Sequence, residues 1–189
     1  MFEQTVQAYK PKGFDYHVVA GLMPEYMFND HAHWKPWGAL KADKKMKWPL
    51  FVRPDSGLKS FSGDVFKSAS EVPAAPDELV AYGPVQPIEA EYRFYVVNSK
   101  IITQSKYLPE ESADVPEDVV TCAKSLVQIL YNRGYRHLDY TLDVVVSGGL
   151  VYLLETNCLF TSGLYKCDKE KLENAINSDM ALPRTDGRG

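Results

Sequence analysis

The sequence predicts an α+β fold in which antiparallel hairpins are combined with a few separate helices. Two pairs of apolar, strand-like segments flank short polar turns at 98–100 and 147–149, which is typical of β-hairpins. Residues 119–132 and 168–178 instead carry apolar side chains at helical spacing. Because strands and helices do not alternate one by one, this order argues against a parallel α/β sheet.

The composition sets limits on the class of protein. The chain has 189 residues, of which 45% are hydrophobic and 24% charged, as is usual for a globular protein. Its net charge of −4 argues against nucleic acid as a partner. No apolar run reaches the roughly 18 residues of a membrane span. The three cysteines are irregularly spaced, which favours a reducing, cytoplasmic setting over a disulfide framework.

The first patterned segment suggests contact with phosphate. Residues 1–48 show no sustained period, and we expect them to be irregular. Residues 49–53 then have the pattern of a short buried strand that ends in Arg53, and 64–67 the pattern of a returning strand. The loop between them contains Lys59, Ser60 and Gly63, and glycines let backbone N–H groups approach phosphate oxygens. The spacing is not that of a Walker A loop, and an ordinary surface turn is the alternative.

The middle of the chain places a cation inside a strand. Residues 79–88 are apolar but contain glycine and two prolines, so we expect an extended segment. In the following hairpin, 91–98 and 101–107, Arg93 lies between two aromatic residues. An unpaired buried charge is costly, so Arg93 must face a wet cleft or an anion. Glu91 shares its face, and a surface pair between Glu91 and Arg93 is the alternative.

Two helices have recognisable ends. For the helix at 119–132, Asp114 and Glu117 form a predicted capping pair, and Gly134 is the predicted stop. Asp168 is the predicted cap of the last helix, at 168–178.

The second hairpin predicts a metal site. Glu155 and Asn157 are two residues apart and therefore share a strand face. If Val146 pairs with Leu150, Asp143 lies opposite Leu153 and joins the same face, whereas a register shifted by one residue would separate them. Two carboxylates and an amide oxygen suit Mg²⁺ shared with a nucleotide. An ordinary solvated strand face is the alternative, although Asp143 interrupts an apolar run.

Taken together, these segments resemble the ATP-grasp superfamily, and most of all its small phage-associated clade named for arginine and lysine. The stretches that carry the resemblance are FVRPDSGLKSFSG, EYRFYVVNSKIITQSKY, LDVVV and LLETNCLFTSGLYKCD. The resemblance implies two α+β lobes with ATP between them: a first lobe at 49–88 and a second at 89–189. It further implies that 1–48 is a reduced form of the domain that precedes the ATP-grasp lobes in related ligases.

The resemblance also implies roles for individual residues. Asp143, Glu155 and Asn157 would bind Mg²⁺, and Arg93, with Lys106 as a second cation, would act on the transferring phosphate. The residues implied in nucleotide binding are Arg53, Lys59, Ser60, Gly63, Val85, and Glu89 or Glu91 for the ribose. The loop at 56–63 would cover the phosphates.

The reaction implied by the resemblance is ATP-dependent joining of a carboxylate to an amine through an acyl-phosphate. The expected partners are small-molecule or peptide substrates, in the host cytoplasm if the protein is phage-encoded. A kinase-like phosphotransferase would use the same nucleotide residues, and a nucleotide-binding regulator without turnover is a third alternative. The sequence leaves open whether the chain forms a homodimer.

Overall fold

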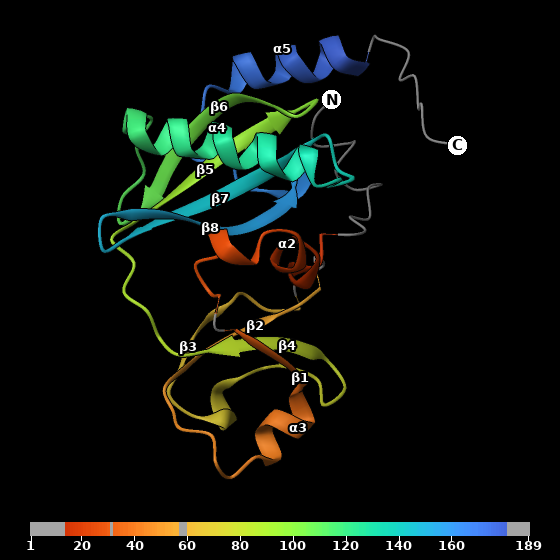
Figure 1. Cartoon of the computed structure of the whole chain (residues 1–189), viewed down its shortest axis with the longest axis vertical. Coiled ribbons are helices and arrows are strands. Elements are labelled where there is room, and N and C mark those ends of the chain that lie inside the picture. Colours follow the sequence, from red (N-terminus) through yellow and green to blue (C-terminus); the bar gives the residue numbers. More distant parts are fainter. Residues whose placement is uncertain (1–13, 31, 57–59, 181–189) are drawn as a thin grey trace.

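The computed structural model describes residues 14–30, 32–56 and 60–180, which form two lobes, each built on one antiparallel sheet (Figure 1). The first lobe contains the sheet β1-β4-β2-β3 and helix α3. Its elements are β1 (His33–Pro36), α3 (Trp37–Ala42), β2 (Leu50–Pro54), β3 (Asp64–Phe66), the 3₁₀ turn η2 (Ala69–Glu71) and β4 (Leu79–Gly83). Trp37, Leu40 and Val52 are among the residues of its small core.

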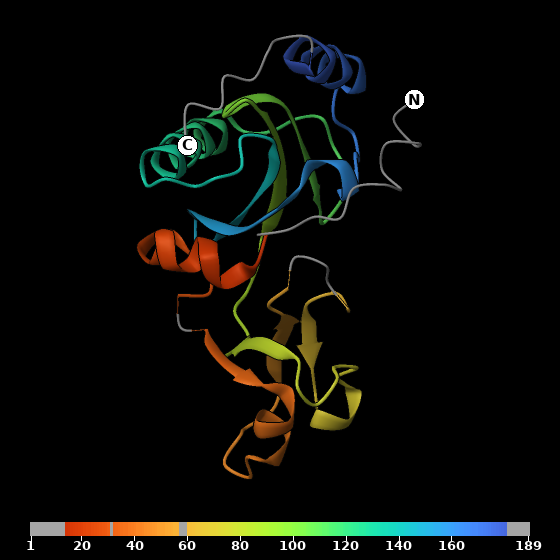
Figure 2. The same ribbon diagram turned by 90° about the vertical axis from the view of Figure 1, so that its right-hand side faces the viewer.

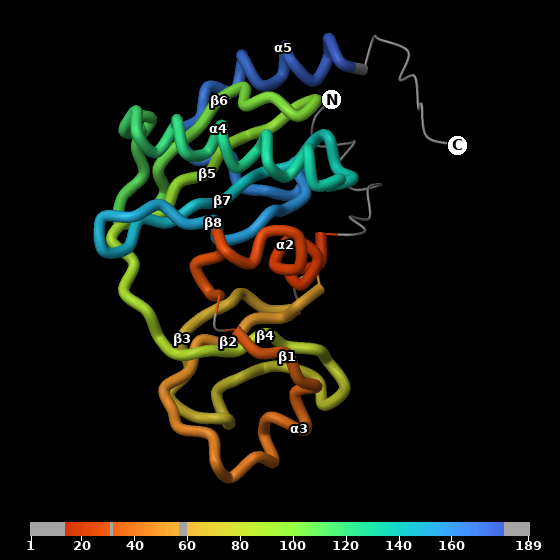
Figure 3. The backbone as a smooth tube through the Cα atoms, in the orientation of Figure 1, coloured from red at the N-terminus to blue at the C-terminus, as the bar shows by residue number. Residues whose placement is uncertain are grey.

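The second lobe contains the sheet β6-β5-β7-β8 and the longer helices. Its elements are β5 (Ala90–Val97), β6 (Lys100–Leu108), α4 (Glu117–Asn132), β7 (Tyr140–Ser147), β8 (Leu150–Cys158), the 3₁₀ turn η3 (Leu159–Thr161) and α5 (Lys169–Met180). An extended segment at 84–89 joins the lobes, and the tube in Figure 3 follows this connection from β4 to β5. Both predicted hairpins are therefore confirmed.

The two faces of the second sheet have different roles. Phe94 of β5, Leu142 of β7 and Leu153 of β8 are fully buried against α4 and α2. On the opposite face, Tyr95 packs with Leu172 of α5. Because side chains alternate along a strand, the residues next to Tyr95 on this second face point towards the first lobe or α5 rather than into the main core. The candidate site lies on that face.

The segment before residue 49 differs from the irregular one that we expected. It forms α2 (Tyr16–Leu22) and the 3₁₀ turn η1 (Pro24–Tyr26), which pack on the second lobe, as well as β1 and α3 of the first. Figure 2 shows α2 lying between the two sheets. The helices have seven and six residues. Helices this short are stabilised by tertiary packing rather than by their own sequence, so no long period marks them.

The predicted helix ends are confirmed in two cases and wrong in one. Gly134 ends α4 with φ = +81°, a conformation that glycine adopts without strain. Asp168 caps α5, since its Oδ1 accepts a 2.9 Å hydrogen bond from the Lys171 N–H. The capping pair of Asp114 and Glu117 is wrong: α4 begins at Glu117, after Pro116, without a side-chain cap. None of the helices within 14–30, 32–56 and 60–180 is long and apolar enough to cross a membrane.

Candidate active site

Four polar residues meet at the centre of the second sheet, on the face away from α4. Arg93 of β5 lies directly opposite Asp143 of β7, and Asp143 lies directly opposite Glu155 of β8. Asn157 follows two residues after Glu155, and its Nδ2 donates a 3.1 Å hydrogen bond to Asp143 Oδ2. All four residues are at most 9% exposed. The predicted convergence of Asp143, Glu155 and Asn157 is therefore confirmed, whereas their binding of metal stays a prediction.

The hairpin reaches this arrangement by a different register from the one we expected. Near the turn, Val146 pairs with Val151 instead of Leu150, which is a shift of one residue. Continued without interruption, this register would place Asp143 opposite Leu154 and on the other face from Glu155. A β-bulge between Asp143 and Val144 adds one residue on β8 and restores the shared face.

Arg93 is held by two hydrogen bonds to Asp143. Its Nε lies 2.7 Å from Oδ1 and its Nη2 2.7 Å from Oδ2, which is the planar bidentate geometry that arginine favours with carboxylates. Burial alone would lower the pKa of Arg93, but the neighbouring Asp143 charge outweighs burial and the pKa is raised. The guanidinium is therefore a permanent buried cation of fixed orientation.

Two stacked tyrosines flank this guanidinium. The rings of Tyr107 and Tyr165 are 4.9 Å apart and nearly parallel, and the Arg93 Cζ lies 5.4 Å from the first and 5.2 Å from the second. Arg93 Nη1 also donates to the Gly163 carbonyl at 3.3 Å, as does the Tyr95 hydroxyl at 2.8 Å. The segment after β8 is thus fixed over Arg93. The sequence offered no distinctive signal for Tyr107 or Tyr165 beyond their place near conspicuous polar residues.

A second ion pair connects the lobes. Arg53, at the end of β2 in the first lobe, donates from Nη2 to Glu155 Oε2 at 2.5 Å, and both side chains are largely buried. The Arg53 Cζ also lies 4.1 Å from the centre of the Tyr16 ring in α2. Burial raises the pKa of Tyr16, which keeps its hydroxyl protonated. The predicted phosphate-contacting cation and a predicted metal ligand are therefore neighbours, although they are 102 residues apart in the chain.

The glycine-containing loop is described only at its two ends, and Lys59 lies outside the described residues. Ser60 donates its hydroxyl hydrogen bond to Glu78 of the first lobe. Gly63 lies against β2: a Cβ at this position would be 2.8 Å from the Arg53 Cβ and 3.2 Å from the Phe51 ring. Close packing beside Arg53 is therefore one reason for glycine at this position.

The remaining predicted nucleotide residues lie at the connection between the lobes. Val85 is exposed, and Glu89 accepts a 2.6 Å hydrogen bond from the Gly148 N–H of the second hairpin turn. Glu91 is partly buried on the face of Arg93. Burial, helped by the nearby Asp143 and Glu155 charges, raises the pKa of Glu91. The structure thus gives Glu89 a contact within the lobe and places Glu91 nearer to the buried cluster.

The position of Lys106 does not favour its expected catalytic role. Lys106 lies opposite Tyr92, and residues directly opposite share a face, so its backbone position points away from the face of Arg93. Its Nζ lies 3.8 Å from Glu110. Strand alternation alone does not reveal the β-bulge between Glu91 and Tyr92, which brings the neighbouring Tyr107 to Arg93 instead.

The buried cluster suits both phosphate and a hard cation. Arg53 and Arg93 supply two positive charges, and Asp143, Glu155 and Asn157 supply oxygen atoms of the kind that Mg²⁺ prefers. Within the described ranges, no three His, Cys, Asp or Glu side chains gather as a ligand group. The third oxygen donor would therefore be the Asn157 amide, whose nitrogen already faces Asp143.

The fold places the chain among the ATP-grasp proteins. It is similar to D-alanine–D-alanine ligase from Helicobacter pylori (TM-score 0.62, 15% identity, covering 91% of this chain and 59% of the ligase). It is also similar to the Bacillus anthracis ligase (TM-score 0.60, 13% identity, 88% of this chain and 67% of the ligase) and to the same enzyme complexed with ATP (TM-score 0.58, 14% identity, 88% and 64%). The chain thus spans 59–67% of the length of these ligases.

The family follows from a sequence match that is independent of these structures. Residues 32–175 match the ATP-grasp domain of the second family in the clade named for arginine and lysine, and the chain belongs to this family. No match was found among curated proteins. The predicted fold and the predicted superfamily are confirmed, whereas the association with phages stays a prediction.

Proposed function

We propose that this protein binds ATP with Mg²⁺ between its two lobes and joins a carboxylate to an amine. The observation that carries the proposal is the buried cluster at the lobe junction, in which Arg53 and Arg93 face Glu155 and Asp143. Buried charges are retained in proteins at a considerable desolvation cost. Their concentration at the junction, and not in either core, is therefore a reason to assign them a function.

Each arginine has a distinct task in the proposed site. Arg93 is already oriented by its bidentate contact with Asp143, so it would meet the transferring phosphate without further ordering. Arg53 comes from the first lobe and would exchange its Glu155 partner for a nucleotide phosphate. That exchange would leave the Glu155 carboxylate available to a cation. The proposal therefore links the binding of nucleotide to the binding of metal.

Glu155, Asn157 and Asp143 are the residues that would hold Mg²⁺. When bound, Mg²⁺ would neutralise charge on the phosphate oxygens and polarise the transferring group. Asp143 has a double role in this proposal, because its two oxygens also position Arg93. The surrounding burial strengthens every charge interaction in the cluster.

The proposed reaction has two balanced steps. A carboxylate oxygen of the substrate bonds to the γ-phosphorus of ATP while the bond to the ADP oxygen breaks, which gives an acyl-phosphate. The amine nitrogen then bonds to the acyl carbon, loses a proton, and releases inorganic phosphate as the leaving group. Arg93 would stabilise the charge that develops on the phosphoryl oxygens in the first step.

The likeness to D-alanine–D-alanine ligases supports this class of reaction, since their name states the joining of two amino acids. The substrates of this chain are left at the level of a carboxylate and an amine, carried by small molecules or peptides. The expected nucleotide contacts at the linker, with Val85 and either Glu89 or Glu91, remain part of the proposal.

The test is to incubate the protein with ATP, Mg²⁺ and a pool of amino acids and small organic acids, and to identify products by mass spectrometry. We expect ADP, phosphate and a new amide. Arg93→Lys, which retains the charge but loses the planar bidentate geometry, should lower turnover about 100-fold. Lys124→Arg, a change at an exposed position of α4, is the matched control and should leave turnover unchanged.

Two outcomes would contradict the ligase proposal. Phosphate transferred to a product without amide formation would show a kinase-like reaction, although the nucleotide residues would keep their roles. Absence of ATP binding by calorimetry, in the presence of Mg²⁺, would remove the nucleotide site itself.

A further inference from the structure

A cavity lies apart from the residues of the candidate active site. It has a volume of about 720 Å³, which is suitable for a small molecule. Helix α2 forms one wall through residues that include His17 and Gly21, and residues 134–137 after α4 form the other. None of its lining residues belongs to the cluster around Arg93. The cavity therefore requires a separate explanation.

The two walls of this cavity are held together at several points. Arg133, at the end of α4, donates 2.7 Å and 2.5 Å hydrogen bonds to the Leu22 carbonyl and to Glu25. The rings of Phe14 and His137 stack with their centres 3.9 Å apart. These contacts tie both ends of the α2 segment to the segment after α4, so the cavity is a feature of the packed fold.

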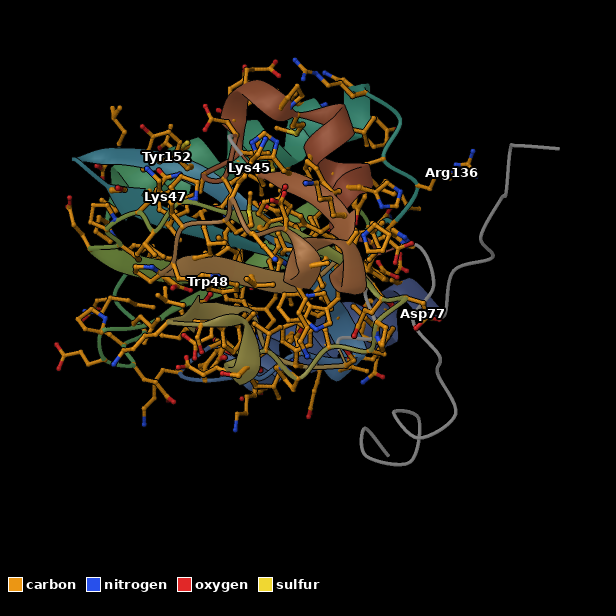
Figure 4. The ribbon with its side chains drawn as sticks, turned by 90° about the horizontal axis from the view of Figure 1, so that it is seen from below. Lys45, Lys47, Trp48, Asp77, Arg136 and Tyr152 are labelled. Atoms are coloured by element: carbon orange, nitrogen blue, oxygen red, sulfur yellow. The ribbon has the colours of Figure 1, made fainter. Side chains whose placement is uncertain are left out.

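The lining combines basic side chains with apolar surface. His17, Arg136 and His137 line the cavity, and no Asp or Glu is among its lining residues. Figure 4 shows Arg136 at the edge of the molecule, with its side chain extending from the chain segment that carries it. Val18, Leu22 and Tyr135 provide the apolar part. Arginine pairs readily with carboxylates, so this combination suits an organic anion with an apolar body.

The ring of His17 is oriented by a buried carboxylate. Its Nδ1 lies 2.5 Å from Asp55 Oδ2, and its backbone N–H donates to Asp55 Oδ1 at 2.9 Å. The Trp34 Nε1 donates to the same Oδ1 at 3.0 Å, which fixes the carboxylate in turn. With Nδ1 engaged, Nε2 is the ring nitrogen that remains for a ligand, and the His17 side chain is 54% exposed.

We propose that this cavity is a binding site for a small organic carboxylate. Arg136 contacts the carboxylate at the rim, the His17 Nε2 offers a second polar contact, and the apolar walls cover the body of the ligand. The proposal does not depend on the ligase reaction, because the cavity shares no residue with the nucleotide and metal cluster.

The test uses ¹H–¹⁵N NMR titrations of the whole chain with benzoate and hexanoate, and with benzamide as the neutral counterpart of benzoate. We expect both carboxylates to shift the backbone amides of Gly21, Gly134 and His137, and benzamide to bind at least about tenfold more weakly. Arg136→Gln, at an exposed position, should weaken benzoate binding about fivefold, as is usual for an exposed ion pair. Lys124→Gln removes an exposed cation elsewhere and should change nothing.

A second variant fills the cavity. A Cβ added at Gly21 meets no atom within 4 Å, so Gly21→Leu can extend into open space without displacing its neighbours. We expect it to abolish benzoate binding while the spectrum of the folded protein and the affinity for ATP are retained. Ser125→Leu, on the exposed side of α4, is the matched control. The proposal is overturned if neither carboxylate shifts these amides, if benzamide binds as well as benzoate, or if Gly21→Leu binds benzoate like the wild type.

Discussion

Replacing Arg93 by methionine should reveal how strongly the buried ion pair depends on both partners. The Asp143 side chain is completely buried and receives two 2.7 Å hydrogen bonds from Arg93. Removal of one partner of such a pair leaves an uncompensated charge, which costs about 3–5 kcal/mol. The 3.1 Å hydrogen bond from Asn157 to Asp143 would survive, so we expect a loss near the lower end of this range, about 3 kcal/mol, in the free energy of unfolding.

The double variant Arg93→Met/Asp143→Leu removes both charges and should recover most of this loss. Apolar side chains that replace a whole buried ion pair are often tolerated or stabilising, so we expect the double variant to lie within about 2 kcal/mol of the wild type. Urea unfolding, followed by circular dichroism, measures all four members of this cycle.

The same variants report on the proposed metal. If Asp143 is a ligand, Mg²⁺ can supply the charge that Arg93→Met has lost. Mg²⁺ should therefore raise the urea midpoint of Arg93→Met more than that of the wild type, and should not stabilise the double variant in this way. A loss below about 1 kcal/mol for Arg93→Met would refute the reasoning, because it would mean that Asp143 is solvated once the arginine is gone.

Three further predictions concern single residues. Gly63→Ala should cost about 1–3 kcal/mol in urea unfolding, because its Cβ would lie 2.8 Å from Arg53, whereas Gly21→Ala in α2 should be neutral or stabilising; equal effects would mean that β2 yields to the added methyl group. Glu91→Gln should gain stability over the wild type as the pH rises: burial raises the pKa of Glu91, so its contribution is fully present below the usual value of 4.5 and is lost as the pH passes through the higher folded value. Urea midpoints from pH 4 to pH 8 test this, and a constant difference would contradict it. Arg93→Lys should change the calorimetric ATP affinity less than about threefold while turnover falls about 100-fold; equal losses in both would mean that Arg93 contributes to binding alone.

The local periodicities of the sequence were sufficient to predict most of the second lobe. Both hairpins and the helices α4 and α5 depend on neighbouring residues: polar turns, alternating strands and helical spacing. The shared face of Glu155 and Asn157 follows from their separation by two residues alone. Residues 14–42 carry no such signal, because their short helices and β1 are stabilised only by packing against the two sheets.

The assembly of the candidate site was decided by the tertiary structure. The position of Asp143 beside Glu155 depends on a bulge that corrects a one-residue shift, and no periodicity contains that information. A second bulge places Tyr107, and not Lys106, next to Arg93. The contacts of Arg53 with Glu155 and of His17 with Asp55 join residues 102 and 38 positions apart. The residue types predicted the chemistry, but only the packing of the lobes determines which charges become neighbours.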